Sequence, residues 1–158
     1  MEQLISKLKS ENYNITINDS KIGIKFDVIA TKKIGFVMKA KFNILIKDVG
    51  IFGKEEFNEW LLKFKLLSEK AKNYWIGEYF ALVLIVDDAD LNSELIKSIS
   101  DVHYLYGLKA GGGKIIITNK QKKVVLADLG QSPWVIQKSY EFVKKTMQEY
   151  LDLQSIAS

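Results

Sequence analysis

The stretch from Lys21 to Lys47 constrains the fold most, because apolar and polar residues alternate along nearly all of it. Alternation with a period of two is the pattern of a β-strand with one buried face. The alternation stops between Thr31 and Gly35, which predicts a turn there. We therefore expect two strands that pair as a β-hairpin, with one apolar face and one polar face.

The polar face of this hairpin is rich in lysine. In the expected pattern its members are Lys21, Gly23, Lys25, Asp27, Lys39, Lys41, Asn43 and Lys47. Side chains two residues apart on a strand are neighbours, so Lys39 and Lys41 are expected side by side, with Asp27 near them if the strands pair. One carboxylate among several ammonium groups is an arrangement suited to phosphate.

Length and composition indicate one domain over residues 1–158. The chain has 47% hydrophobic residues, enough for a buried core, and no segment reads as a linker. We expect the tail over 152–158 to fray. No apolar run reaches membrane-spanning length, and the start of the chain lacks the apolar core of a signal peptide. The sequence therefore predicts a cytoplasmic protein without membrane contact.

The charge is positive and carried entirely by lysine. The formal net charge is +4, the pI is about 9.0, and all 23 basic residues are lysine. A positive domain suits a polyanionic partner. The lack of arginine counts against reading of base edges, because the guanidinium fork is the usual reader of guanine. An A+T-rich genome explains the same composition without any nucleic-acid role.

The pattern of the whole chain predicts a single α/β (α+β) domain with a mixed sheet flanked by helices. We expect helices over 2–9, 54–72, 93–106 and 132–151, with strands over 13–18, 21–28, 36–47, 79–86, 114–118 and 123–128. The run 79–86 is apolar on both sides, as in a central strand that helices cover on both faces. The order αβββαβαββα implies an antiparallel N-terminal meander followed by crossovers.

Three other motifs contain residue types that can carry chemistry. The acids from Asp87 to Asp90 follow the buried strand, where α/β sheets often bind ligands, although they equally suit a turn that caps the next helix. The glycine-rich stretch 107–114 is excluded as a phosphate loop, because Leu108 and Ile115 occupy its glycine and hydroxyl positions. The lack of cysteine and the single histidine, His103, argue against a classical zinc site.

In this order of elements the chain resembles the restriction-endonuclease-like core of the PD-(D/E)XK nucleases. The resemblance covers most of the chain as an order of elements. It implies a metal-binding aspartate at Asp27 and a catalytic lysine at Lys41, two residues after the position of a second acid. That position is Lys39 here. An ammonium group would repel Mg²⁺, so a metal site needs another acid, such as Glu11, Asp48 or Glu78.

Three interpretations follow. The first is a nuclease-like domain that needs no cofactor and does not cut. It would bind DNA or RNA phosphates through Lys25, Lys39, Lys41 and Lys47. The second is a protein-interaction or assembly subunit, binding a protein partner or a second copy, with contacts expected at Tyr74, Trp75 and Trp134. The third is an active Mg²⁺-dependent nuclease whose metal ligand includes Asp27.

Overall fold

The computed structural model describes residues 1–35, 40–70, 78–89, 113–130 and 136–154. Its elements, in chain order, are α1 (Glu2–Ser10), β1 (Asn14–Lys21), β2 (Ile24–Ile34), β3 (Ala40–Phe52), α2 (Lys54–Lys70), β4 (Glu78–Ala89), β5 (Gly113–Asn119), β6 (Val124–Leu129) and α4 (Gln137–Leu153). The expected α/β fold with a mixed, helix-flanked sheet is confirmed. The helix predicted over 93–106 lies outside the described residues.

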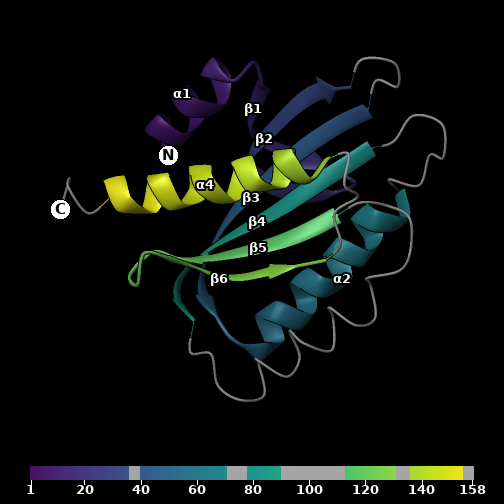
Figure 1. Cartoon of the computed structure of the whole chain (residues 1–158). Helices are drawn as coiled ribbons and strands as arrows, with labels where there is room; N and C mark the ends of the chain where they lie inside the picture. The colour runs from purple at the N-terminus through teal and green to yellow at the C-terminus, as the bar shows by residue number, and fades with distance from the viewer. Residues whose placement is uncertain (36–39, 71–77, 90–112, 131–135, 155–158) are drawn as a thin grey trace.

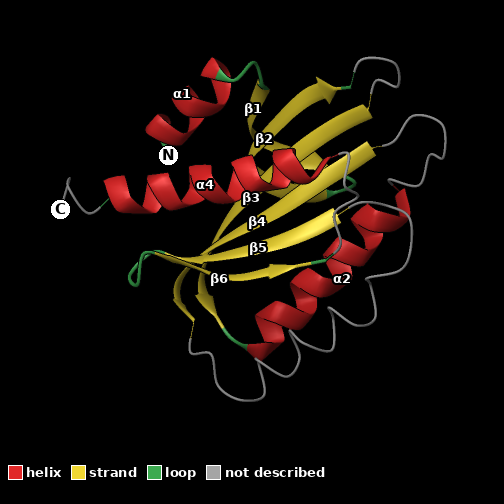
Figure 2. Cartoon of the chain, viewed as in Figure 1, coloured by secondary structure: helices red, strands yellow, loops and turns green. Residues whose placement is uncertain are grey.

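The six strands form one sheet in which spatial order follows chain order, from β1 to β6. Strands β1, β2 and β3 pair antiparallel, β3, β4 and β5 run parallel, and β6 returns antiparallel to β5. Figure 2 shows the strands side by side, with α2 crossing from the end of β3 to the start of β4. Such a crossover is what parallel neighbours require, so the N-terminal meander and the parallel centre are confirmed.

Helices cover the sheet on both faces. In Figure 1, α1 and α4 lie together on one face and α2 lies on the other. Two core clusters correspond to these layers. The α2-side cluster takes Phe57, Trp60, Phe64 and Leu67 from α2, and the opposite cluster takes Tyr140, Val143, Met147 and Leu151 from α4. On each helix these residues recur with the period of 3.6 that is typical of an amphipathic helix.

Strand β4 runs through the middle of this core. Residues 80–86 are all buried and alternate between the two clusters, with Leu82 and Leu84 facing α2 and Val83 and Ile85 facing α4. The expected central strand is therefore confirmed. No helix among the described residues is long and apolar enough to cross a membrane.

The first hairpin turns later than the sequence indicates. The sequence predicts strands over 13–18 and 21–28 with a turn between them, but β1 continues to Lys21 and the chain reverses at Ile22 and Gly23. Both turn residues have positive φ, 56° and 74°, as a two-residue type I′ hairpin requires. Strand β2 then runs to Ile34, so it includes most of the stretch from Thr31 to Gly35, where the sequence predicts a turn.

The alternation of β2 changes phase at Asp27. Phe26 belongs to the α2-side cluster and Val28 to the α4-side cluster, although they are two residues apart. The β1–β2 ladder passes from the pair Ile17–Val28 to the pair Asp19–Phe26 and skips Asp27 and Asn18, whose φ is 52°. Pairing between β2 and β3 also ends at Val28, opposite Ile46. The hairpin tip is thus free to leave the plane of the sheet.

The tip of the β1–β2 hairpin folds back over the α2 side. The pairing of β2 with β3 ends at Val28 and Ile46. Lys21 pairs with Ile24, which lies four residues from Val28 toward the hairpin tip. Lys41 lies five residues from Ile46 in the opposite direction along the sheet. In a flat sheet these two ends would be about 30 Å apart. Nevertheless, Lys21 forms an ion pair with Glu78, the neighbour of Lys41. The described fold therefore brings the hairpin tip to the start of β4.

Candidate functional site

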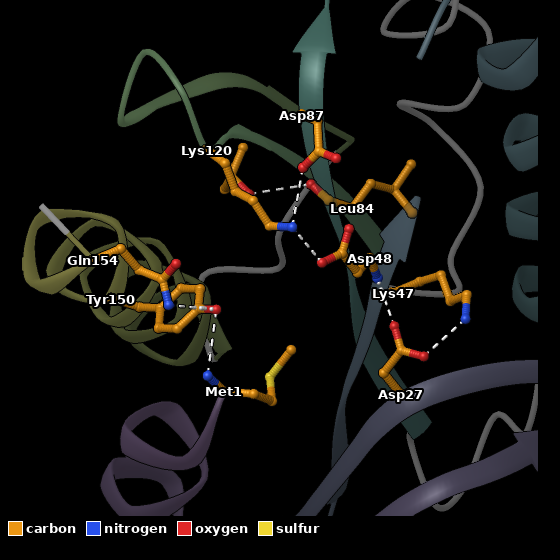
Figure 3. A network of polar contacts seen from close by, with 10 residues as sticks. Met1, Asp27, Lys47, Asp48, Leu84, Asp87, Lys120, Tyr150 and Gln154 are labelled. Carbon is orange, nitrogen blue, oxygen red and sulfur yellow. Dashed lines mark hydrogen bonds and ion pairs between the residues drawn. The ribbon is translucent and has the colours of Figure 1, made fainter. Parts of the chain in front are cut away.

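Asp27 and Lys47 form an ion pair on the α2 side of the sheet. The Lys47 Nζ donates to Asp27 Oδ1 at 2.8 Å, and the backbone N–H of Asp48 donates to Asp27 Oδ2 at 2.7 Å (Figure 3). Both carboxylate oxygens of Asp27 are therefore engaged. Through these two hydrogen bonds the Asp27 side chain joins β2 to β3 just beyond Val28, where the backbone pairing of the two strands ends.

The structure does not bring Asp27 and Lys41 together. The lysine beside Asp27 is Lys47, and Lys41 lies six residues earlier on β3, about 20 Å away along the strand. The residue two positions before Lys47 is Leu45, which is buried in the core. The joint site for Asp27 and Lys41 implied by the nuclease resemblance is therefore not formed. The reason is that β2 and β3 pair in a register that places Lys41 opposite Lys33.

A second polar group lies where the parallel strands end, on the α4 side. Lys120 Nζ lies 2.6 Å from Asp48 Oδ2 and 3.0 Å from Asp87 Oδ1 (Figure 3). Burial alone would lower the pKa of Lys120, but its hydrogen bonds to the two carboxylates, and their charges, raise it above its ordinary value. Asp87, the first residue of the acidic run 87–90, and Asp48 on β3 thus hold a protonated lysine between them.

The carboxylates do not converge on a metal position. No cluster of three or more histidine or acidic side chains occurs in the described part of the chain. Asp48 turns its carboxylate toward Lys120, Glu78 binds Lys21 near the opposite end of β3, and the backbone carbonyl of Glu11 accepts from Lys32. The carboxylates of Asp48 and Glu78 thus bind lysines elsewhere, and Asp48 contacts Asp27 only through its backbone N–H. The described residues therefore do not fit Mg²⁺ at Asp27.

Lys41 lies in a different group, near the start of β3. Its cross-strand neighbours are Lys33 on β2 and Glu78 on β4, so the three side chains share one face. Lys21 reaches the same carboxylate from the folded-back hairpin. We call Lys21, Lys33 and Lys41 the lysine cluster: the charges of Lys21 and Lys41 act on the Glu78 carboxylate, and Lys33 lies directly across from Lys41.

A buried asparagine fixes Glu78 in this group. Asn43 is only 1% exposed, and its Oδ1 accepts from the Thr31 hydroxyl at 3.0 Å. Its Nδ2 donates to Glu78 Oε1 at 2.8 Å and to the Tyr79 carbonyl at 3.3 Å. Asn43 therefore links β2, β3 and β4 through one side chain. A buried amide that is bonded at both ends specifies strand register as well as the position of Glu78.

The charge state of Glu78 follows from these contacts. Burial alone would raise the pKa of Glu78. The hydrogen bond and charge of Lys21, the charge of Lys41 and the hydrogen bond from Asn43 together outweigh burial and lower that pKa below its ordinary value. Glu78 is therefore ionised at neutral pH and offsets part of the positive charge of the lysine cluster.

The remaining predicted contact residues are scattered. Lys25 is exposed, and because its neighbours Ile24 and Phe26 point into the core, it faces outward from the hairpin. Lys47 is paired with Asp27. The structure does not describe Lys39, Tyr74, Trp75, His103 and Trp134, nor residues 107–112. The sequence interpretation missed Lys33 as a strand residue because it placed a turn there.

No protein-family model, curated protein or solved structure matches this chain.

Proposed function

We propose that the protein binds the phosphate groups of a nucleic acid through the lysine cluster, and that it does so without metal-dependent cleavage. The observation that supports this most is the direct cross-strand pairing of Lys33 with Lys41. Like charges directly opposite each other destabilise a sheet. Among the described strand neighbours of these two lysines, only Glu78 carries a negative charge that offsets theirs. A bound phosphate would relieve the repulsion that remains.

The chemistry of lysine favours backbone phosphates over bases. Cβ atoms of directly opposed residues lie about 5 Å apart, so the Lys33 and Lys41 ammonium groups can approach one phosphate or two successive ones. Lysine acts as a flexible point charge rather than as a planar reader. Both side chains are exposed. The expected interaction is independent of base sequence and sensitive to salt.

The same geometry argues for binding without cutting. Hydrolysis by a nuclease of the resembled family requires carboxylates that hold a divalent metal ion. In the described structure Asp27 is bonded to Lys47, while Asp48 and Asp87 share Lys120. Each of these carboxylates already faces an ammonium group. In this proposal the nuclease-like order of elements serves as a scaffold that presents lysines to phosphate.

Fluorescence anisotropy with labelled single- and double-stranded DNA and RNA, at low salt and with or without Mg²⁺, tests the proposal. The variant Lys33→Glu/Lys41→Glu is compared with Lys9→Glu/Lys138→Glu, which makes the same charge change at exposed sites on α1 and α4. We expect the cluster variant to bind about tenfold more weakly or worse, and the control to lose much less.

Three results would contradict the proposal. Absence of binding by the unaltered protein at low salt would remove the nucleic-acid role. Equal losses in both double variants would mean that net charge, and not the lysine cluster, governs binding. Shortening of the labelled strands that depends on Mg²⁺ would show that a metal site exists despite the paired carboxylates.

A further inference from the structure

The tip of the β1–β2 hairpin carries an isoleucine in an unfavourable backbone conformation. Ile22 is the first of the two turn residues, and its φ is 56°. Positive φ values suit glycine and asparagine, whereas a β-branched residue is strained there. The other non-glycine residues with positive φ in the described part of the chain are Asn12, Asn18 and Lys123, and none of them is β-branched. Backbone strain of this kind is concentrated at functional sites.

The side chain of Ile22 is not needed to fill the core. It is 42% exposed and belongs to neither core cluster, whereas Ile24 is 9% exposed and packs in the α2-side cluster. A Cβ added at Gly23 would meet no atom within 4 Å, so the space beside the turn is open. Asparagine, which this type of turn prefers, would remove the strain. The hairpin therefore presents an apolar side chain to solvent at a cost in stability.

Positive charge flanks this exposed isoleucine on both strands of the hairpin. Lys21 precedes Ile22 directly and belongs to the lysine cluster. Lys25 lies on β2 and is exposed. In the β1–β2 ladder Lys21 pairs with Ile24 and Lys25 with Ser20, so both lysines lie within two residue pairs of the turn. A nucleic acid whose phosphates contact these lysines would bring its bases next to Ile22.

We propose, on the basis of the phosphate binding proposed above, that Ile22 inserts as an apolar wedge between two stacked base pairs of double-stranded DNA. Isoleucine is among the side chains that proteins insert in this way, and insertion partly unstacks the base step and bends the duplex. The Lys21–Glu78 ion pair and the burial of Ile24 hold the tip in place before DNA binds. An apolar wedge reads no base edge through hydrogen bonds, so it agrees with binding that is independent of base sequence.

A short duplex in which 2-aminopurine replaces adenine at each TA step tests the wedge. The fluorescence of 2-aminopurine rises when the base is unstacked, and TA steps are easily unstacked. With the full chain at saturation and low salt, we expect fluorescence to rise with the unaltered protein and not with Ile22→Asn. By anisotropy, Ile22→Asn should also bind the duplex several-fold more weakly.

The matched control is Ile51→Asn, which makes the same change at an isoleucine that is 82% exposed, at the end of β3 away from Lys41. We expect this control to bind and to raise the fluorescence like the unaltered protein. Thermal unfolding checks the strain: Ile22→Asn should melt a few degrees higher than the unaltered protein, because asparagine suits the turn. A lower melting temperature would mean that Ile22 serves the packing of the tip and would overturn the proposal.

The salt dependence of binding separates failure of the wedge from failure of phosphate binding. Ile22→Asn removes no charge, so its salt slope should equal that of the unaltered protein, whereas Lys33→Glu/Lys41→Glu should have a smaller slope. Salt-sensitive binding without a rise in fluorescence would overturn the wedge and leave phosphate binding intact. An Ile22→Asn variant that behaves like Ile51→Asn would do the same. Absence of salt-sensitive binding by the unaltered protein would overturn both.

Discussion

Lys21 and Glu78 are 57 residues apart in the sequence and form an ion pair that joins the tip of the β1–β2 hairpin to the first residue of β4. The contact requires the hairpin to fold back over the sheet. It also places the Lys21 ammonium group on the Glu78 carboxylate, next to Lys41. The lysine cluster is therefore a product of the tertiary fold rather than of any one strand.

Replacing Glu78 with Gln should strengthen binding to nucleic acid. Glu78 competes with phosphate for Lys21 and Lys41, and glutamine keeps an oxygen that can accept from Asn43. We expect several-fold tighter binding at low salt, measured by anisotropy, because one opposing charge is removed. Weaker or unchanged binding by a folded Glu78→Gln variant would contradict a role for the lysine cluster.

The same substitution should change how stability depends on pH. The pKa of Glu78 is lower in the folded protein than its ordinary value. The stability that ionised Glu78 adds is therefore fully present above the pKa of Glu78 in the unfolded chain, and it is lost as pH falls through the folded pKa. Urea unfolding should show the unaltered protein about 1 kcal/mol more stable than Glu78→Gln at pH 7. This difference should shrink below about pH 4.5. A difference that stays constant down to pH 3 would speak against the ion pair.

Removing Lys120 should leave two carboxylates facing each other. In Lys120→Met, Asp48 and Asp87 lose the ammonium group that both contact. The pKa of Lys120 is raised above its ordinary value in the folded protein, so the stability that this lysine adds is fully present at neutral pH and is lost as pH rises through the folded pKa. We expect the variant to lose about 1 kcal/mol at pH 7 by urea unfolding, and its difference from the unaltered protein to shrink above about pH 10.5.

The matched control for this variant is Lys122→Met, which alters an exposed lysine in the same turn. It should change stability by less than about 0.5 kcal/mol. If both variants lose the same stability at pH 7, the contact of Lys120 with the two aspartates contributes nothing particular.

Gly113→Ala should be strongly destabilising because β5 starts against aromatic rings. A Cβ at this position would lie 2.4 Å from Phe80 Cζ and 3.0 Å from Phe64 Cε2. We expect a loss of about 1–3 kcal/mol in thermal or urea unfolding, as overpacked core sites show. Gly23→Ala meets no atom within 4 Å, so its loss should come only from positive φ and should be smaller. A larger loss of stability in Gly23→Ala than in Gly113→Ala would contradict the close packing of Gly113.

The core of this fold was predictable because its signals are local. The α2 stripe around Phe57 and Phe64 and the apolar run of β4 each lie within one element, and burial follows directly from their periodicity. Asn43 shows where that reasoning stops. Alternation assigned it to a polar face with Lys41, yet it is buried, because the fold covers that face of β3.

The lysine cluster was not predictable, because it depends on a fold-back and on a strand register that the alternation of residues does not determine. The change of phase at Asp27 accompanies a positive φ at Asn18, and the fold-back is held by a pair formed with Glu78 on a distant strand. Lys33 became a cross-strand neighbour of Lys41 only because β2 continues past the expected turn. Such contacts depend on register and tertiary packing, and one sequence read strand by strand does not determine either.

The salt dependence of nucleic-acid binding tests the central claim most directly. If Lys21, Lys33 and Lys41 each contact a phosphate, the logarithm of the binding constant should fall with the logarithm of salt concentration with a slope of about −2 to −3. The Lys33→Glu/Lys41→Glu variant should lose about 2 from the size of that slope, while Lys9→Glu/Lys138→Glu should keep most of it. Binding that ignores salt, or a slope that the cluster variant leaves unchanged, would contradict phosphate recognition by these lysines.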